Sequence, residues 1–417
     1  MHYESSRLAN GVTVVTEHMD GVSSVTLGLW VRSGSREETP ETAGISHFME
    51  HMLFKGTPTR DAFQIALEGD AIGADMNAFT SRECTCFHAR VTDAHFAEAF
   101  EILADMLVNA KFDDADMDLE REVVLEEIAR SADTPEDSVG DLFFDALLPT
   151  HPLGRPVLGD ASVVSALTGE DMRAWHASRC TTGNVWVCAA GAIDHETVVS
   201  LAERHLSGLC EGPVLERPHP EIGEGERLAV QCRDTEQAHL VIGMPSVSRD
   251  DPMRWAMGLY ATIMGGSMSS RLFAEVREKR GLAYSIAAGL QTYEDTGAFA
   301  VAAGTRPENL AEVMRIIDSE LSRAARAGVT EEELERARDN LSSHWIMGLE
   351  STYTRMMRLG RPSVSGMPIL STEETLAKFA EVSTDDIARA AAQLSRGKHS
   401  VAVISPWRPE EVEEMLP

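Results

Sequence analysis

The sequence predicts an α+β fold of two homologous domains, each a mixed, mostly antiparallel β-sheet packed with helices. Its 417 residues, 43% of them hydrophobic, are enough for more than one hydrophobic core. The predicted order of elements recurs after about 200 residues, which indicates duplicated domains. Residues 211–226 combine several prolines and glycines with acidic residues, which is typical of an extended linker. We therefore place the two domains at residues 1–210 and 227–417.

In the first domain, apolar runs predict strands, and apolar residues spaced three or four apart predict helices. The predicted strands lie at 12–17 and 24–31, as a pair within 74–91, and at 184–190. The predicted helices lie at 45–54, 62–69, 94–109, 113–130, 136–148 and 169–178, and a last helix ends at 206.

The second domain repeats this order. Its predicted strands lie at 239–244, 283–291, 298–303 and 400–404. Its predicted helices lie at 252–264, 270–279, 308–326, 331–348, 372–382 and 384–394.

The most informative motif is His-Phe-Met-Glu-His at residues 47–51. On a helix, His47 and His51 lie one turn apart on one face, so both rings can bind the same metal ion. Glu50 projects near the same edge, where its carboxylate can take a proton from an attacking water. The order His-x-x-Glu-His is the inverted zincin signature. From the pentapeptide alone, a helix with two unrelated histidines is the alternative.

A third ligand would decide between these alternatives, because catalytic zinc takes three protein ligands and keeps one position open. The helix around Glu127 can supply it. Its apolar residues Val123, Val124 and Ile128 predict the buried face. At 100° per residue, Glu127 falls about 60° from Val124, whereas Glu126 falls about 160° away, toward solvent.

Glu120 precedes Glu127 by seven residues and differs from it by only about 20° around the helix axis. The two carboxylates therefore form a pair on the predicted buried face. Burying carboxylates is costly unless they are paired or bind a metal ion. A charged helix edge with solvated carboxyl groups is the alternative from the sequence alone.

These residues resemble the zinc site of the insulinase/pitrilysin-type metallopeptidases, and are most similar to the mitochondrial-processing-peptidase-like branch. Glu127 lies 76 positions after His51, as the family pattern requires, and the resemblance covers nearly the whole chain. It implies that His47, His51 and Glu127 bind one zinc ion (Zn2+) per chain. It also implies that Glu50 is the general base. Glu120 would assist catalysis, either directly or by a hydrogen bond to a residue that binds the metal ion.

The second domain has no His-x-x-Glu-His motif, and Leu341-Ser342-Ser343-His344 stand where the carboxylate pair is expected. We therefore expect this domain to serve substrate binding, assembly or both, and not to bind zinc in the same way.

Residues 277–284 resemble the family's arginine–tyrosine pair for substrate binding. The resemblance implies that Arg277 and Tyr284 hydrogen-bond the peptide near the scissile carbonyl and help to stabilise the oxyanion. The alternative is a cationic helix end that stops at Gly281, which explains Lys279 and Arg280 but not Tyr284.

Residues 77–83 match the family's edge strand. The resemblance implies that Asn77, Ala78 and Phe79 bind an extended peptide by β-addition along an unpaired strand edge. The alternative is that Phe79 belongs only to the core and Asn77 only to a turn.

Charge and composition limit the partners. A formal net charge of −30 argues against nucleic acid. The same charge can attract basic peptides, or it can serve solubility alone. No apolar run of about 18 residues predicts a membrane span, and the N-terminus lacks a secretory pattern, so we predict a cytoplasmic protein. The six cysteines lack paired CxxC spacing and are predicted to be reduced.

Together these observations predict a zinc-dependent endopeptidase that hydrolyses peptides or unfolded segments. The alternative is a non-catalytic assembly or peptide-binding subunit of a heteromeric processing complex, because some family members lack the zinc residues. Family enzymes enclose the substrate between two halves of two domains each, and this chain supplies one half. Because it retains both the zinc residues and the Arg277/Tyr284 pair, we expect a homodimer whose sites are completed in trans.

Overall fold

The computed structural model describes residues 3–217, 219, 225, 228–397 and 399–417. The chain forms two compact units. Unit 1 consists of Met1–Ala129, Arg155–Pro218 and Ile346–Ser371, and unit 2 of Arg130–Gly154, His219–Trp345 and Thr372–Pro417. The linker predicted at 211–226 lies partly outside the described residues.

Unit 1 is built on a six-stranded sheet with the order β1-β2-β6-β3-β5-β4. Its strands are β1 (Tyr3–Arg7), β2 (Thr13–His18), β3 (Ser24–Val31), β4 (Asp75–Thr80), β5 (Thr85–Thr92) and β6 (Val185–Gly191). Only β2 and β6 pair in parallel, and all other neighbours are antiparallel. β4 is therefore an edge strand, because β5 is its one neighbour in the sheet.

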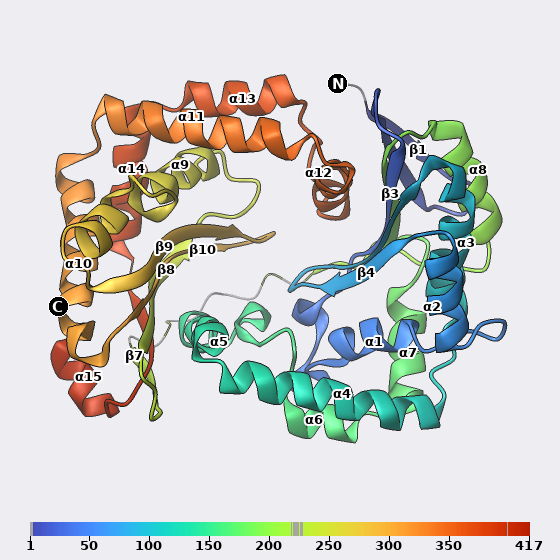
Figure 1. The fold of residues 1–417 in the computed structure, drawn as a ribbon, viewed down its shortest axis with the longest axis horizontal. Helices are drawn as coiled ribbons and strands as arrows, with labels where there is room; N and C mark the ends of the chain where they lie inside the picture. Colours follow the sequence, from blue (N-terminus) through green and yellow to red (C-terminus); the bar gives the residue numbers. More distant parts are fainter. Residues whose placement is uncertain (1–2, 218, 220–224, 226–227, 398) are drawn as a thin grey trace. The chain divides into compact units, whose positions relative to one another are not determined.

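Unit 2 repeats this sheet, and its described residues hold no counterpart of β1. Its strands are β7 (Leu228–Cys232), β8 (Ala238–Ser246), β9 (Ala283–Thr292), β10 (Gly297–Thr305) and β11 (Ser400–Ser405). Their order is β7-β11-β8-β10-β9, and β7 with β11, the counterpart of β2 with β6, is the parallel pair among the described strands. The predicted fold class, two domains that each pack a mixed sheet with helices, is confirmed (Figure 1).

The helices follow the predicted order with small shifts at their ends. In the first half they are α1 (Ile45–Leu53), α2 (Ala62–Ala71), α3 (Phe96–Asn109), α4 (Asp114–Asp133), α5 (Pro135–Leu147), α6 (Ala161–Ala166), α7 (Gly169–Arg179) and α8 (His195–His205). In the second half they are α9 (Arg254–Gly265), the π-helix η5 (Phe273–Glu278), α10 (Leu310–Ala327), α11 (Glu331–Gly348), α12 (Thr352–Val364), α13 (Thr372–Glu381), α14 (Thr384–Arg396) and α15 (Pro409–Met415).

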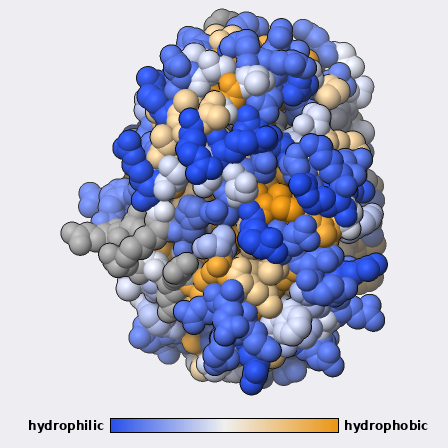
Figure 2. All heavy atoms as spheres, turned by 90° about the vertical axis from the view of Figure 1, so that its left-hand side faces the viewer, coloured by the Kyte–Doolittle hydropathy of each residue, from blue (hydrophilic) through white to orange (hydrophobic). Residues whose placement is uncertain are grey.

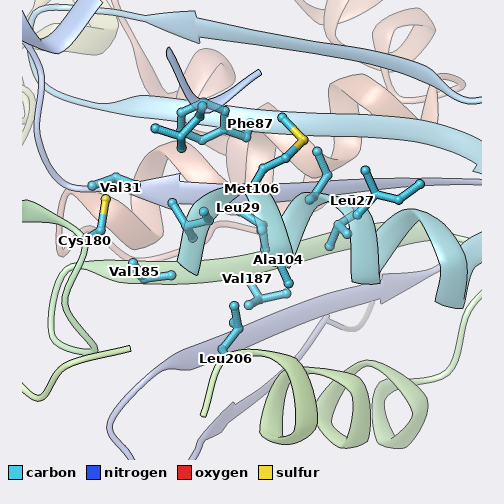
Figure 3. Close-up of a cluster of buried hydrophobic side chains, with 14 of the residues drawn as sticks. Leu27, Leu29, Val31, Phe87, Ala104, Met106, Cys180, Val185, Val187 and Leu206 are labelled. Carbon is cyan, nitrogen blue, oxygen red and sulfur yellow. The ribbon is translucent and has the colours of Figure 1, made fainter. Parts of the chain in front are cut away.

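The main core of unit 1 lies between one face of its sheet and the helices α1, α3, α7 and α8. Figure 3 shows part of it, where Leu27, Leu29 and Val31 of β3 meet Val185 and Val187 of β6. Continuous apolar runs are expected for strands that are covered on both faces, and β3 is buried along nearly its whole length.

The second face of each sheet is covered by a helix from the other half of the sequence. α12 packs on β2, β3 and β6 of unit 1, and α5 packs on β7, β8 and β11 of unit 2. The predicted division into 1–210 and 227–417 describes the two halves of the sequence, whereas the compact units exchange these helices. Five helices and strands, β1, β7, α6, α12 and α15, were not predicted.

Buried polar contacts fix α12 on the sheet. The carboxylate of Glu17, only 1% exposed, accepts hydrogen bonds from the guanidinium groups of Arg355 and Arg358. Thr352 and Thr26 share a hydrogen bond of 2.8 Å between their hydroxyl groups. Because a buried charge without its partner is strongly destabilising, these contacts specify the position of α12.

Gly360 brings α12 close enough for a stability test. A Cβ atom at this position would lie 2.0 Å from Cε2 of Trp30, which is fully buried. We expect Gly360→Ala to lower the free energy of unfolding by about 1–3 kcal/mol through overpacking, measured by chemical denaturation. The matched control is Gly140→Ala on α5, where a Cβ meets nothing within 4 Å and should be neutral or slightly stabilising. Equal stabilities of the two variants would contradict the close contact.

The face of the molecule drawn in Figure 2 is mostly polar. On the face shown in Figure 2, hydrophilic residues predominate and hydrophobic residues gather in small groups. Among the helices of the described residues, none combines the length and the apolar character that a membrane span requires.

Candidate active site

Helix α1 carries three of the predicted site residues. Its buried apolar residues are Ile45, Phe48, Met49, Met52 and Leu53. With these side chains in the core, His47, Glu50 and His51 project from the remaining faces. His47 is 7% exposed, and His51 and Glu50 are half-buried.

Glu38 fixes the N-terminus of α1. The first backbone N–H groups of a helix have no acceptor within the helix. The N-cap residue Gly44 has φ 98° and no side chain, so another residue must accept their hydrogen bonds. The Glu38 carboxylate accepts hydrogen bonds from the backbone N–H groups of Gly44 and Ser46, each at 2.9 Å. Burial raises the pKa of Glu38 to about 7, and these hydrogen bonds oppose the shift. A carboxylate at this end also interacts favourably with the helix dipole.

Helix α4 supplies the predicted carboxylates. Glu120 and Val124 are buried, Glu127 is half-buried and Glu126 is exposed, as the helix-face argument predicted. The prediction for Val123 was wrong, because this side chain is 51% exposed. The buried stripe of α4 is narrow, and Val123 lies 100° around the helix axis from Val124, beyond its edge.

Three possible metal ligands converge between α1 and α4. One nitrogen each of His47 and His51 and one Glu127 oxygen all lie within 4.8 Å of one another. Nε2 of His47 is 3.6 Å, and Nε2 of His51 is 3.4 Å, from Oε2 of Glu127. Tetrahedral zinc, with ligand distances near 2.0–2.2 Å, separates its ligand atoms by about 3.5 Å. The donor types and their spacing therefore fit zinc, and the described residues offer no second group of this kind.

Glu120 orients His51. Its Oε1 atom lies 2.8 Å from Nδ1 of His51, and its Oε2 atom lies 2.5 Å from Nζ of Lys55. With the proton on Nδ1, the Nε2 lone pair faces Glu127 and is available to a metal ion. Burial would raise the pKa of Glu120, but the hydrogen bonds from His51 and Lys55 lower it below its usual value.

The two histidines differ in their electrostatics. Burial, followed by the charge of His51, lowers the pKa of His47 to about 4, so its ring is neutral at pH 7. Burial also lowers the pKa of His51, but the hydrogen bond and charge of Glu120 outweigh it and raise the pKa above its usual value. A metal ion must compete with this proton on His51, so metal affinity should fall as pH falls.

Glu50 meets Thr80, the last residue of β4. The Thr80 hydroxyl donates a hydrogen bond of 2.5 Å to Oε2 of Glu50. Burial raises the pKa of Glu50, whereas this hydrogen bond and the charge of His51 lower it. A raised pKa makes a carboxylate a stronger base near neutral pH. No role was predicted for Thr80, although it directly follows the predicted peptide-binding residues of the edge strand.

The predicted peptide-binding residues of unit 1 lie on the edge strand. Asn77, Ala78 and Phe79 are in the middle of β4, so the alternative that Asn77 belongs to a turn was wrong. Asn77 is exposed, whereas Phe79 is half-buried and packs edge-on against Trp30 with a centroid distance of 5.6 Å. Phe79 therefore contributes to the core as well as to the edge strand.

Arg277 and Tyr284 lie together in unit 2. The Arg277 guanidinium stacks over the rings of Tyr284 at 5.0 Å and Phe273 at 4.9 Å. Gly281, with φ 62°, turns the chain from η5 into β9, which places the two residues side by side. Tyr284 is 79% exposed, so its hydroxyl is free to meet a ligand.

Comparison with known proteins decides the family. Residues 13–161 match the insulinase family, peptidase family M16, and residues 166–341 match the peptidase M16 inactive domain. The chain belongs to peptidase family M16. It is thus a zinc protease of the M16 type by family, and its second part matches a domain that is described as inactive.

Bacterial relatives of this M16 chain span nearly its whole length. An uncharacterized zinc protease of Streptomyces coelicolor is 40% identical over 415 residues, which is 98% of this chain and 90% of the relative. One of Mycobacterium tuberculosis is 41% identical over 96% of this chain and 92% of the relative. A third, from Bacillus subtilis, is 36% identical over 95% and 97%.

Solved structures show the same fold. A peptidase M16 inactive domain from Pseudomonas fluorescens superposes with a TM-score of 0.91 at 22% identity, covering 98% of both chains. A protease from Helicobacter pylori superposes with a TM-score of 0.90 at 21% identity, covering 97% of this chain and 100% of the other.

Proposed function

We propose that this chain is a zinc endopeptidase that hydrolyses peptides or unfolded segments in a chamber between two subunits. The observation that carries the proposal is the convergence of His47, His51 and Glu127, with Glu50 beside them. Each chain would hold one zinc ion through these three side chains.

In the proposed hydrolysis of a peptide bond, the bound zinc, Glu50 and Glu120 each have a separate role. Bound zinc supplies Lewis-acid chemistry, which polarises the scissile carbonyl and acidifies the attacking water. Glu50 takes one proton from this water as its oxygen attacks the carbonyl carbon. When the C–N bond breaks, Glu50 delivers that proton to the leaving nitrogen. Glu120 holds the His51 ring in place throughout.

The edge of β4 is the proposed peptide-binding strand. β5 is the one neighbour of β4 among the described residues, so the other edge of β4 can pair with an extended peptide. The Ala78 N–H now donates to Oδ1 of Asn77 at 2.8 Å and would exchange this acceptor for a peptide carbonyl. Asn77, Ala78 and Phe79 would align the peptide backbone beside α1. Backbone pairing gives affinity without demanding a particular sequence, which suits a peptidase for unfolded segments.

The second domain supports assembly and substrate binding in the proposal. Arg277 and Tyr284 would contact the peptide near the scissile carbonyl and stabilise the oxyanion. Because family enzymes enclose the substrate between two halves, a homodimer would complete each site with the partner copy's pair. The alternative role, a non-catalytic subunit of a heteromeric complex, is disfavoured by the retained His47/Glu50/His51/Glu127 set.

A metal assay combined with peptide-library cleavage tests the proposal. We expect about one zinc per chain, cleavage that is lost with a chelator, and recovery on adding zinc. Absence of zinc and of cleavage would favour the assembly role.

The net charge of −30 makes a separate prediction about substrates. Lys/Arg-rich peptides should be favoured, and their kcat/KM should fall with added salt. Equal rates for acidic and basic peptides at low salt would leave the charge a solubility feature.

A further inference from the structure

Thr80 contacts Glu50 of α1 through its side-chain hydroxyl, and its backbone N–H adds a weaker hydrogen bond to the same carboxylate. An ionised carboxylate can only accept, so the Thr80 hydroxyl is the donor to Oε2 of Glu50, at 2.5 Å. The Thr80 oxygen also lies 3.4 Å from the Thr85 hydroxyl. Thr85 donates its own proton to the backbone carbonyl of Ser33 at 2.9 Å. The Thr85 oxygen can therefore only accept from Thr80, and at 3.4 Å it is a weaker acceptor than the Glu50 carboxylate at 2.5 Å, so the Thr80 proton is directed at Glu50.

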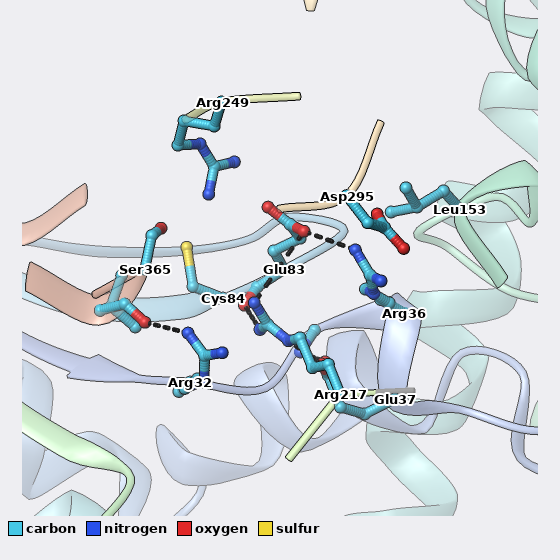
Figure 4. Close-up of polar contacts among 12 residues, drawn as sticks. Arg32, Arg36, Glu37, Glu83, Cys84, Leu153, Arg217, Arg249, Asp295 and Ser365 are labelled. Carbon is cyan, nitrogen blue, oxygen red and sulfur yellow. Dashed lines mark hydrogen bonds and ion pairs between the residues drawn. The ribbon is translucent and has the colours of Figure 1, made fainter. Parts of the chain in front are cut away.

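The turn that follows Thr80 is held by buried contacts. The backbone N–H of Ser35 donates to the carbonyl of Ser81 at 3.2 Å. Arg36 donates to Oε1 of Glu83 at 2.8 Å, with both side chains at most 6% exposed. Arg217 adds a hydrogen bond to the backbone carbonyl of Glu83 (Figure 4). A charge network of this kind is costly to break, so the end of β4 keeps a fixed position.

The opposite partner, Glu50, is fixed through its helix. α1 is anchored by five buried apolar side chains and by the Glu38 contacts at its N-terminus. The Glu50 side chain alone retains rotational freedom, because three torsions separate its carboxylate from the backbone. One hydrogen bond from a rigid strand removes much of that freedom.

We propose that Thr80 is the positioning residue of the general base, holding Oε2 of Glu50 so that Oε1 is presented to the attacking water. The Thr80 hydroxyl donates a hydrogen bond and exchanges no proton with the substrate. The proton from water goes to Oε1, because the Thr80 hydrogen bond turns Oε2 toward β4 and makes it the less basic of the two oxygens. This inference rests on the proposed function, in which Glu50 is the general base.

The test compares Thr80→Val, which keeps the shape but removes the donor, with Thr80→Ser, which keeps the donor. We expect Thr80→Val to lower kcat about 10- to 100-fold, as for other residues that orient a catalytic group. KM for a peptide, zinc content and the unfolding temperature should stay close to the wild type. Thr80→Ser should restore most of kcat, and a crystal structure of Thr80→Val should show the Glu50 carboxylate rotated away from its wild-type orientation.

Thr13→Val is the matched control, because Thr13 lies on β2, four positions from β4 in the sheet order. It should leave kcat unchanged. An unchanged kcat in Thr80→Val, or a loss that Thr80→Ser fails to recover, would overturn the inference. So would a parallel loss of zinc or of folding, which indicates a structural role. If the wild-type protein cleaves no peptide, the proposed function fails. The orientation of Glu50 in the Thr80→Val crystal still decides the inference about Thr80.

Discussion

Glu50→Gln should lose turnover by about 10²–10⁴-fold while it keeps its zinc, because the amide cannot accept the proton of the attacking water. Glutamine has nearly the same shape and can still accept the Thr80 hydrogen bond through its carbonyl oxygen. The predicted ligands, His47, His51 and Glu127, are untouched. On the same preparation of Glu50→Gln, peptide cleavage should therefore be lost while the zinc content stays at the wild-type value.

The ligand variants should behave differently. His47→Ala, His51→Ala and Glu127→Gln remove a metal-binding atom, so zinc content and activity should fall together. Glu126→Gln is the matched control on the exposed face of α4 and should be nearly silent. An essential Glu126 would show that the helix-face argument is wrong. Loss of zinc in Glu50→Gln would place Glu50 among the ligands.

Much of the fold follows from local sequence patterns. Periodicity predicted most strands and helices because their buried residues recur at two or at three to four positions. β3 and α11 have the predicted boundaries, Ser24–Val31 and Glu331–Gly348. The repeated order of elements was sufficient to predict two related sheets, and both have the same strand order apart from β1.

Local patterns could not predict that α12, from the second half of the sequence, packs on the sheet of unit 1. α12 contains Gly360 and Pro362, which lower helix propensity, and no helix was predicted there. Tertiary contacts explain the helix: Gly360 allows close packing on Trp30, and Arg355 and Arg358 meet the buried Glu17. Such pairings join residues more than 300 positions apart and leave no local signal.

The site shows the same division between local and tertiary information. Helical offsets predicted that His47 and His51 share one face and that Glu127 lies on the buried side of its helix, and the resemblance to the family joined the three residues into one site. The Thr80–Glu50 hydrogen bond needed the structure, because it depends on how β4 ends beside α1. The prediction that Val123 is buried was wrong for a related reason. An apolar residue at the edge of the narrow buried stripe of α4 can lie in solvent or in the core, and its sequence position does not decide which.

If the protein is a homodimer with sites completed in trans, two inactive variants should complement each other. The zinc residues lie in unit 1 and the Arg277/Tyr284 pair lies in unit 2. In the proposal, each site takes its zinc residues from one subunit and Arg277/Tyr284 from the partner copy. Glu50→Gln and Tyr284→Phe homodimers should both be nearly inactive, the latter because an oxyanion donor is worth about 10²–10³-fold.

Mixing these two inactive variants should restore activity after subunit exchange. In a mixed dimer, one site carries both lesions and the other carries neither. Since half of the dimers are mixed and each has one intact site, activity should reach about a quarter of the wild type. The matched control mixes the wild type with the double variant Glu50→Gln/Tyr284→Phe. Sites in trans again give about a quarter, because every site of the mixed dimer has one lesion, whereas sites in cis give about half. A fully active monomer in sedimentation, or no recovery despite proven exchange, would rule out the trans arrangement.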